Sequence, residues 1–296
     1  VRRLSTLGSV IMRGMMSVDD ARAAIAGAVC PLPAEILPLD QTAGRVLAAP
    51  VIAAISQPPF DASAMDGYAV RLADCAAGAR LKVIGESAAG MRFSGAVADG
   101  TAVRIFTGAP LPPGADHVLI QEEADRDGET VVIRSAQKQA RNIRHAGLDF
   151  RRGDMLADAG AEVSGALAAL VAAGNVAELA VRRRPRVALI ANGDELALPG
   201  HDLGPDDIVS SIPFGLSPMI EGWGGSAEFL GIARDDMDQV AALIEKARSF
   251  DLIIPIGGAS GGDRDLMRAA FRAQGFSAIF EKVSVKPGKP AWFGRL

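Results

Sequence analysis

The chain has 296 residues, of which 49% are hydrophobic, and its formal net charge at pH 7 is −4. This length predicts two or three domains, and the hydrophobic content is sufficient for a core in each of them. The negative charge disfavours a nucleic-acid binder, and only two cysteines indicate a reducing compartment rather than a disulfide scaffold. No segment is expected to cross a membrane, because glycine, asparagine and glutamate interrupt the most apolar stretch, residues 164–181.

Residues 1–14 are interpreted as a flexible leader, and a helix is predicted from Ser17 onward. Ser17 is a typical N-cap, acidic residues follow in the first turn, and apolar residues recur at helical spacing. A second helix is predicted in SGALAALVAAG, which begins at Ser164. Residues 15–51 and 146–182 are therefore predicted to form a discontinuous helical linker domain, which ends at the basic hinge RRRPR.

Residues 52–145 have a different pattern, that of a small all-β domain. Short runs of β-forming residues, LKVIGES, TAVRIFTGAP, DHVLIQEE and ETVVIRS, alternate with turns rich in Gly, Pro and Asp-Gly. The three histidines of the chain, His117, His145 and His201, have no metal-ligand spacing, and each is expected on the surface or in a loop.

Residues 183–296 alternate between strand and helix patterns, which predicts a mostly parallel sheet with right-handed crossovers. The four expected strand-and-loop segments are RVALIANGDEL, SAEFLGIARDD, DLIIPIGGASGGD and SAIFEKVSVKPGKP. Ligands of such sheets bind beyond the carboxyl ends of the strands, so the four loops are expected to share one rim. The loops carry Asp194 and Glu195, Asp235 and Asp236, the turn 257–263, and Lys286 and Lys289.

Carboxylates and lysines on one rim suggest Mg²⁺ together with an anionic ligand such as a phosphate. The alternative is that these are solvated loop charges without a ligand. The turn 257–263 is poor in side chains, which lets a backbone approach a ligand, but it carries Asp263 and lacks the lysine of a phosphate-binding P-loop.

Five motifs together resemble the molybdopterin molybdenumtransferases, the MoeA family, to which the E domain of gephyrin is related. They are PPFDASAMDGYAV at 58–70, RIFTGAPLP at 104–112, ANGDEL at 191–196, GGASGGD at 257–263 and KPGKP at 286–290. The resemblance implies that residues 183–296 form an α/β domain like that of MogA. It also implies insertion of molybdate into adenylylated molybdopterin with release of AMP and the help of Mg²⁺. Members of the family are cytoplasmic homodimers with sites shared between subunits, and a MogA-type adenylyltransferase is an expected partner.

The resemblance also assigns roles to individual residues. The implied catalytic residues are Asp66, Asp263, Lys286 and Lys289. The implied substrate-binding residues are Thr107, Glu195, Gly257, Gly258, Ser260 and Lys282. The implied metal ligands are Glu195, Asp235 and Asp263.

The chain departs from the family pattern at several places. Asn192 stands in the ANGDEL motif where relatives commonly have Thr, and Ile212 stands where an Asn is expected. Pro213 is expected to disturb the entry of the following helix. The sequence stops at AWFGRL, before the final loop and the C-terminal β domain of relatives, so a truncated α/β domain is expected.

Two other functions remain open. The chain could be a non-catalytic or scaffold-type homologue that binds molybdopterin or a nucleotide. It could also be a different enzyme on a MogA-like fold, such as a nucleotide pyrophosphatase, although the motif around Asp66 argues against that.

Overall fold

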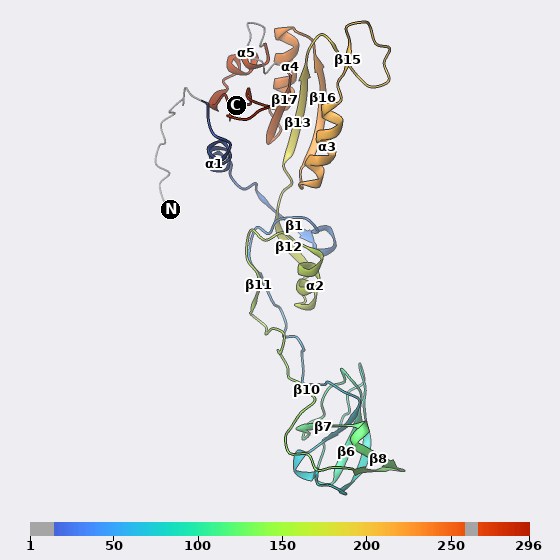
Figure 1. Cartoon of the computed structure of the whole chain (residues 1–296). Coiled ribbons are helices and arrows are strands. Elements are labelled where there is room, and N and C mark those ends of the chain that lie inside the picture. The colour runs from blue at the N-terminus through green and yellow to red at the C-terminus, as the bar shows by residue number, and fades with distance from the viewer. Residues whose placement is uncertain (1–14, 258–265) are drawn as a thin grey trace, which may run out of the picture. The chain divides into compact units, whose positions relative to one another are not determined.

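The computed structural model describes residues 15–257 and 266–296, and their contacts divide the chain into two units (Figure 1). The α/β unit comprises Val1–Glu35 and Arg182–Leu296, and the β-rich unit comprises Ile36–Val181. Helix α1 (Val18–Ala28) thus belongs with the α/β unit, whereas the sequence interpretation grouped residues 15–51 with 146–182. The reason is burial, because Ala21 packs with Phe280 and Val283 of the α/β unit.

The secondary structure of the α/β unit after α1 comprises β13 (Arg186–Asn192), β14 (Leu196–Ala197), β15 (Ile208–Val209), α3 (Ile212–Gly222), β16 (Ser226–Ala233), α4 (Met237–Ala247), β17 (Leu252–Ile256), α5 (Leu266–Ala273), β18 (Ser277–Phe280) and β19 (Phe293–Arg295). Strands β16, β13 and β17 form a parallel sheet in that order. Leu189 packs toward α3, whereas its neighbour Ile190 packs toward α4 and α5. The sheet therefore lies between α3 on one face and α4 and α5 on the other, as Figure 1 shows. The prediction of parallel strands alternating with helices is confirmed for these three strands.

The prediction that a fourth strand joins the parallel sheet is wrong. β18 pairs antiparallel with β19 and not with the three-stranded sheet. Gly294 permits this pairing, because a Cβ atom there would lie 2.1 Å from the carbonyl oxygen of Ser277. The loop that follows β18 and carries Lys286 and Lys289 therefore does not start from the same sheet as the other three loops.

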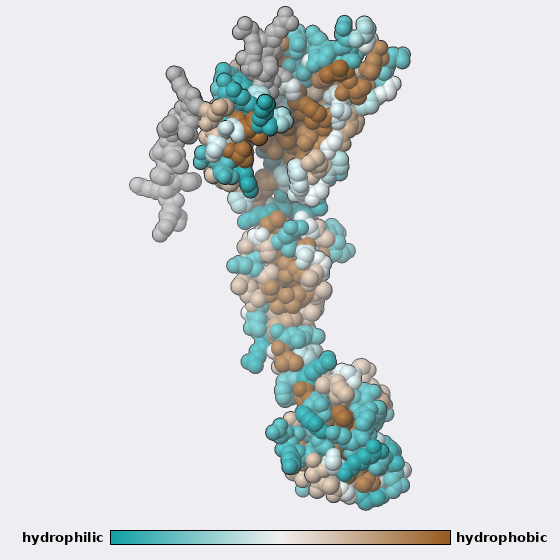
Figure 2. Space-filling model, viewed as in Figure 1, coloured by the Kyte–Doolittle hydropathy of each residue, from teal (hydrophilic) through white to brown (hydrophobic). Residues whose placement is uncertain are grey.

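The expectation that Pro213 disturbs a helix is also wrong, because Pro213 stands in the first turn of α3. The N–H groups of the first turn have no partner within a helix, so proline loses no hydrogen bond there. Ile212 is the first residue of α3 and is 55% exposed. The exposed apolar side chains nearby include Ile208, and Figure 2 shows hydrophobic surface around β15 on the visible face.

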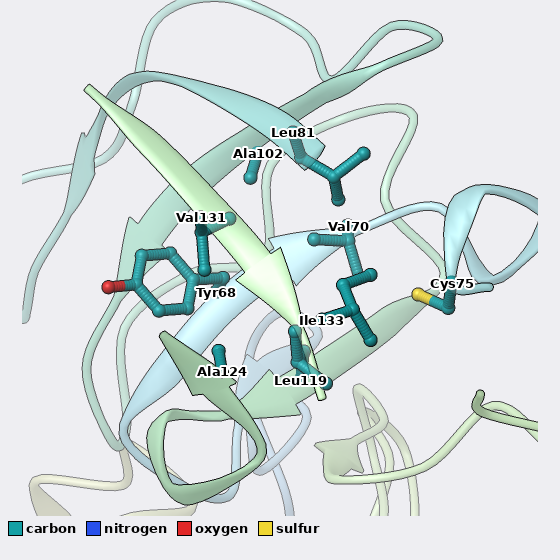
Figure 3. Packing of buried hydrophobic residues seen from close by; sticks show 9 residues of the cluster. All are labelled: Tyr68, Val70, Cys75, Leu81, Ala102, Leu119, Ala124, Val131 and Ile133. Atoms are coloured by element: carbon teal, nitrogen blue, oxygen red, sulfur yellow. The ribbon is translucent and has the colours of Figure 1, made fainter. Parts of the chain in front are cut away.

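The elements that lie wholly or mostly in the β-rich unit are β1 (Ala34–Pro38), β2 (Val51–Ile52), β3 (Ala62–Ser63), β4 (Gly67–Val70), β5 (Arg80–Ser87), β6 (Thr101–Ile105), β7 (His117–Ile120), β8 (Ala124–Asp127), β9 (Thr130–Ile133), β10 (Ile143–Arg144), β11 (Met155–Ala157), α2 (Gly165–Ala173) and β12 (Glu178–Arg182). A six-stranded sheet has the order β7-β4-β6-β5-β9-β8 and includes all four predicted β runs. Its core is packed from both small and large apolar side chains, among them Val70, Leu119 and Ile133 (Figure 3). A separate cluster around Leu47, Val171 and Val181 packs α2 against the segments near β2 and β12.

His117 contradicts the expectation of a surface or loop position. It lies in β7 and is fully buried, and its Nδ1 accepts a hydrogen bond from the backbone N–H of Arg141 at 3.1 Å. His145 and His201 are exposed, as expected. Among residues 15–257 and 266–296, no helix has the length and apolar character needed to span a membrane.

Candidate functional site

Asp66 is the first candidate site residue, and the fold brings it into contact with Thr107, a second residue of the implied site. Asp66 directly precedes β4, and Thr107 lies just beyond β6, the neighbouring strand in the sheet. Oδ1 of Asp66 accepts hydrogen bonds from the backbone N–H of Thr107 at 2.8 Å and from its hydroxyl at 2.9 Å. These bonds, first the backbone and then the hydroxyl, hold the pKa of Asp66 below its usual value. An ionised carboxylate is thus held in a fixed orientation at neutral pH.

Arg104, which the sequence analysis did not single out, lies beside this pair. Its Nη1 donates to the carbonyl oxygen of Gly67 at 3.1 Å, and its Nη2 donates to Oε1 of Gln121 at 2.9 Å. Its guanidinium carbon lies 5.2 Å from the ring centre of Tyr68 and 4.8 Å from that of Phe106. The signal in the sequence was its position three residues before Thr107, within the RIFTGAPLP motif.

In the α/β unit, side chains at the end of β13 fasten it to the end of β16. Nδ2 of the buried Asn192 donates to the carbonyl oxygens of Ala233 at 3.3 Å and Arg234 at 3.0 Å. Oδ1 of Asp194 accepts a hydrogen bond from the backbone N–H of Asp235 at 3.0 Å. The amide of Asn192 is therefore used within the protein, and Asp194 holds the backbone that carries Asp235.

Glu195 and Asp235 follow adjacent strands of the sheet, and both are exposed. Within the described part of the chain, neither carboxylate accepts a hydrogen bond or forms an ion pair. The Glu195 carboxylate occupies the space beside Gly193, where a Cβ atom would lie 2.5 Å from Oε2. Asp236 has a different role from the one expected at the rim, because its Oδ1 caps α4 by accepting from the N–H of Gln239 at 2.9 Å.

The glycine-rich turn after β17 is described only at Gly257; Gly258, Ser260 and Asp263 lie outside the described residues. Gly257 has φ +96°, and a Cβ atom there would lie 2.6 Å from the carbonyl oxygen of Asn192. This position therefore requires glycine both for its backbone conformation and for the close approach to the end of β13.

Two of the described carboxylates, those of Glu195 and Asp235, are candidate ligands for Mg²⁺. Over residues 15–257 and 266–296, no group of three or more His, Cys, Asp or Glu side chains is placed to hold a metal. Mg²⁺ is commonly bound by one or two carboxylates together with phosphate oxygens and water. The exposed carboxylates of Glu195 and Asp235 fit that smaller donor set.

Lys282, Lys286 and Lys289 lie in the loop between β18 and β19, and all three are exposed. The backbone of this loop is held in place, since the carbonyl oxygen of Lys282 accepts from the N–H of Met16 and that of Lys289 from the N–H of Val283. Their ammonium groups form no ion pair with another described residue. Three positive charges on one anchored loop are suited to an anionic ligand.

Residues 16–174 match the family model for the MoeA N-terminal region (domain I and II), and residues 188–296 match the model for a probable molybdopterin binding domain. The chain belongs to the MoeA family. Its resemblance to this family, inferred from the motifs, is thereby confirmed.

Several members of the MoeA family are similar over most of this chain. Molybdopterin molybdenumtransferase of Haemophilus influenzae is 35% identical over 95% of this chain and 70% of its own length. The protein of the same name from a Nostoc species is 34% identical over 86% of this chain and 60% of its own length. The crystal structure of a molybdopterin biosynthesis MoeA protein from Pyrococcus horikoshii has a TM-score of 0.83 at 31% identity, and the match covers 96% of this chain and 72% of that one. These names describe an enzyme, a transferase, of molybdenum cofactor biosynthesis.

Proposed function

We propose that this MoeA-family chain inserts molybdate into adenylylated molybdopterin and releases AMP in a Mg²⁺-dependent reaction. The observation that best supports this is the Asp66–Thr107 pair, which presents an ionised carboxylate from the motif that first suggested the family. One oxygen of Asp66 is occupied by Thr107, so the other is the atom available to a substrate.

The α/β unit would bind the charged part of the substrate. Lys282, Lys286 and Lys289 would neutralise phosphate or molybdate oxygens as point charges. The backbone of Gly257 and Gly258, together with Ser260, would approach the phosphates closely because the turn is poor in side chains.

Glu195 and Asp235, with Asp263, are the residues that would hold Mg²⁺. The bound ion would neutralise charge that develops on the departing phosphate. The described part of the chain keeps Glu195 and Asp235 beyond the ends of adjacent strands, where Asp194 fixes the backbone of Asp235.

We further propose that the chain acts in the cytoplasm as a homodimer and receives its substrate from a MogA-type adenylyltransferase. The family resemblance is what supports the dimer, since it implies a site in which the β-rich unit of one subunit would complete the α/β unit of another. Sedimentation at micromolar concentration that showed monomer only would remove this part of the proposal.

The test is release of AMP from adenylylated molybdopterin by the full chain, with and without molybdate and after removal of metal with a chelator. The expected result is release that needs both molybdate and added Mg²⁺. Binding of the substrate without any release would favour the non-catalytic or scaffold-type homologue. Release that is independent of molybdate would favour a nucleotide pyrophosphatase.

A further inference from the structure

Arg104 of β6 forms hydrogen bonds to residues at the ends of two other strands near Asp66. It lies on β6 directly opposite Tyr68 of β4. Its two Nη atoms donate to different elements, Nη1 to the carbonyl oxygen of Gly67 at the start of β4 and Nη2 to the side chain of Gln121, which follows β7. One side chain therefore crosslinks β6, β4 and the end of β7.

These contacts hold the backbone on both sides of the Asp66 carbonyl. The backbone N–H of Gln121 donates to the carbonyl oxygen of Asp66 at 3.1 Å. The next carbonyl oxygen, that of Gly67, is the acceptor for Arg104. Gln121 therefore contacts Asp66 through its backbone and Arg104 through its side chain.

The arrangement requires arginine rather than a general positive charge. The guanidinium is planar and presents separate N–H donors in a rigid fork, whereas the ammonium of lysine is a single compact donor group. The fork reaches two acceptors at 3.1 and 2.9 Å while the rings of Tyr68 and Phe106 both lie within 5.2 Å of its centre. Cations are attracted to aromatic ring faces at such distances.

We propose that Arg104 is a positioning residue, which fixes the backbone carrying Asp66 and thereby keeps the Asp66 carboxylate on Thr107. Its importance for turnover rests on the proposed function. Both hydrogen bonds from Thr107 go to Oδ1, so the direction of Oδ2 depends on the backbone that Arg104 holds. A displacement of about 1 Å in a group that contacts substrate can lower a rate on the order of a hundredfold.

The first measurement does not depend on activity. Thr107 donates its backbone N–H to Asp66, so the hydrogen-exchange rate of that amide reports whether the pair is intact. In the full chain, Arg104→Lys and Arg104→Gln are both expected to raise this rate at least about tenfold relative to wild type. Arg80→Gln is the matched control, because Arg80 lies on β5 of the same sheet and makes an exposed ion pair with Asp127 at 2.7 Å.

The second measurement is AMP release with adenylylated molybdopterin and molybdate. Arg104→Lys is expected to lower kcat about tenfold or more with little change in KM, while Arg80→Gln matches wild type. The melting temperature of each variant is measured alongside both experiments. If Arg104→Gln does not fold, Arg104→Lys still tests the inference.

The outcomes separate this inference from the proposed function. Unchanged Thr107 exchange in Arg104→Lys would overturn the positioning role, as would faster exchange with an unchanged kcat. If the wild-type chain releases no AMP, the proposed function fails, and the exchange result alone then decides whether Arg104 positions Asp66.

Discussion

Asp66 in the β-rich unit and Glu195 in the α/β unit are both carboxylates at strand ends, yet their surroundings differ. Asp66 accepts two hydrogen bonds from Thr107, and Arg104 and Gln121 hold the backbone around it. Glu195 is exposed, and its carboxylate forms no hydrogen bond or ion pair within the described part of the chain. The first site is thus organised by the protein itself. The second presents charges that a ligand or metal could neutralise.

The largest expected effects on stability come from replacing one glycine at each of the two sites by alanine. In Gly67→Ala a Cβ atom would lie 2.0 Å from the carbonyl oxygen of Leu119, inside the six-stranded sheet. We expect a loss of about 3 kcal/mol in the free energy of unfolding, because the backbones of β4 and β7 must move apart. In Gly257→Ala the new atom meets the carbonyl oxygen of Asn192 at the carboxyl end of the central strand β13, and a loss of about 2 kcal/mol is expected.

Urea denaturation measures both changes. Gly165→Ala is the control, because nothing lies within 4 Å of the added atom at the start of α2. Its expected effect is below about 1 kcal/mol. A larger loss for Gly257→Ala than for Gly67→Ala would show that the backbone around the carboxyl end of β13 is the more tightly packed site.

The two carboxylates should also respond differently when each loses its charge. Asp66→Asn is expected to lower the rate of AMP release about a hundredfold and to speed hydrogen exchange of the Thr107 amide. Glu195→Gln should lower the rate and raise the Mg²⁺ concentration required, with no change in melting temperature, because its carboxylate has no described partner. Glu129→Gln, an exposed change away from both sites, serves as the control. A clear fall in the melting temperature of Glu195→Gln would contradict the comparison.

Replacing lysines of the α/β unit tests whether this unit binds the ligand through charge. Lys286→Ala and Lys289→Ala should each raise KM for adenylylated molybdopterin about tenfold at low salt, and the difference should shrink as salt is added. Thermal stability should not change, since both side chains are exposed. Lys138→Ala, also an exposed lysine but in the β-rich unit, is expected to leave KM as it is. Salt-independent effects would indicate that the lysines support the fold of the loop instead.

The smallest expected effect concerns pH and the β-rich unit. Burial, followed by the charge of Arg141, lowers the pKa of His117. The His117 ring therefore binds a proton more readily in the unfolded chain than in the folded one. The stabilising effect of neutral His117 is present above about pH 6.5 and is lost as the pH falls through its folded pKa.

Between pH 7.5 and 5.5 the melting temperature of the wild type is expected to fall by about 4 °C. His117→Gln should be less stable at both values of pH but should show a smaller fall between them. His201→Gln is the control, because His201 is exposed. An equal fall in wild type and His117→Gln would show that another group controls this pH range.

Local signals in the sequence predicted α1, α2 and the three parallel strands of this protein. Ser17 and Ser164 cap α1 and α2 by accepting hydrogen bonds from backbone N–H groups three residues further along, whereas Asp236, which caps α4, was expected at the rim. The apolar runs of β13, β16 and β17 likewise predicted parallel strands. Such signals act over a few residues, so they can be read without knowledge of the rest of the chain. The resemblance to the family implied a role for Asp66 and another for Thr107, and the structure added the contact between them.

Only the tertiary structure decided which partners distant segments found. It paired β18 with β19, grouped α1 with the α/β unit, buried His117 and placed Arg104 against Gln121. Each of these results depends on residues far apart in the sequence, which meet only after the chain has folded. Burial and strand pairing are set by the sum of many such contacts, and no short motif encodes that sum.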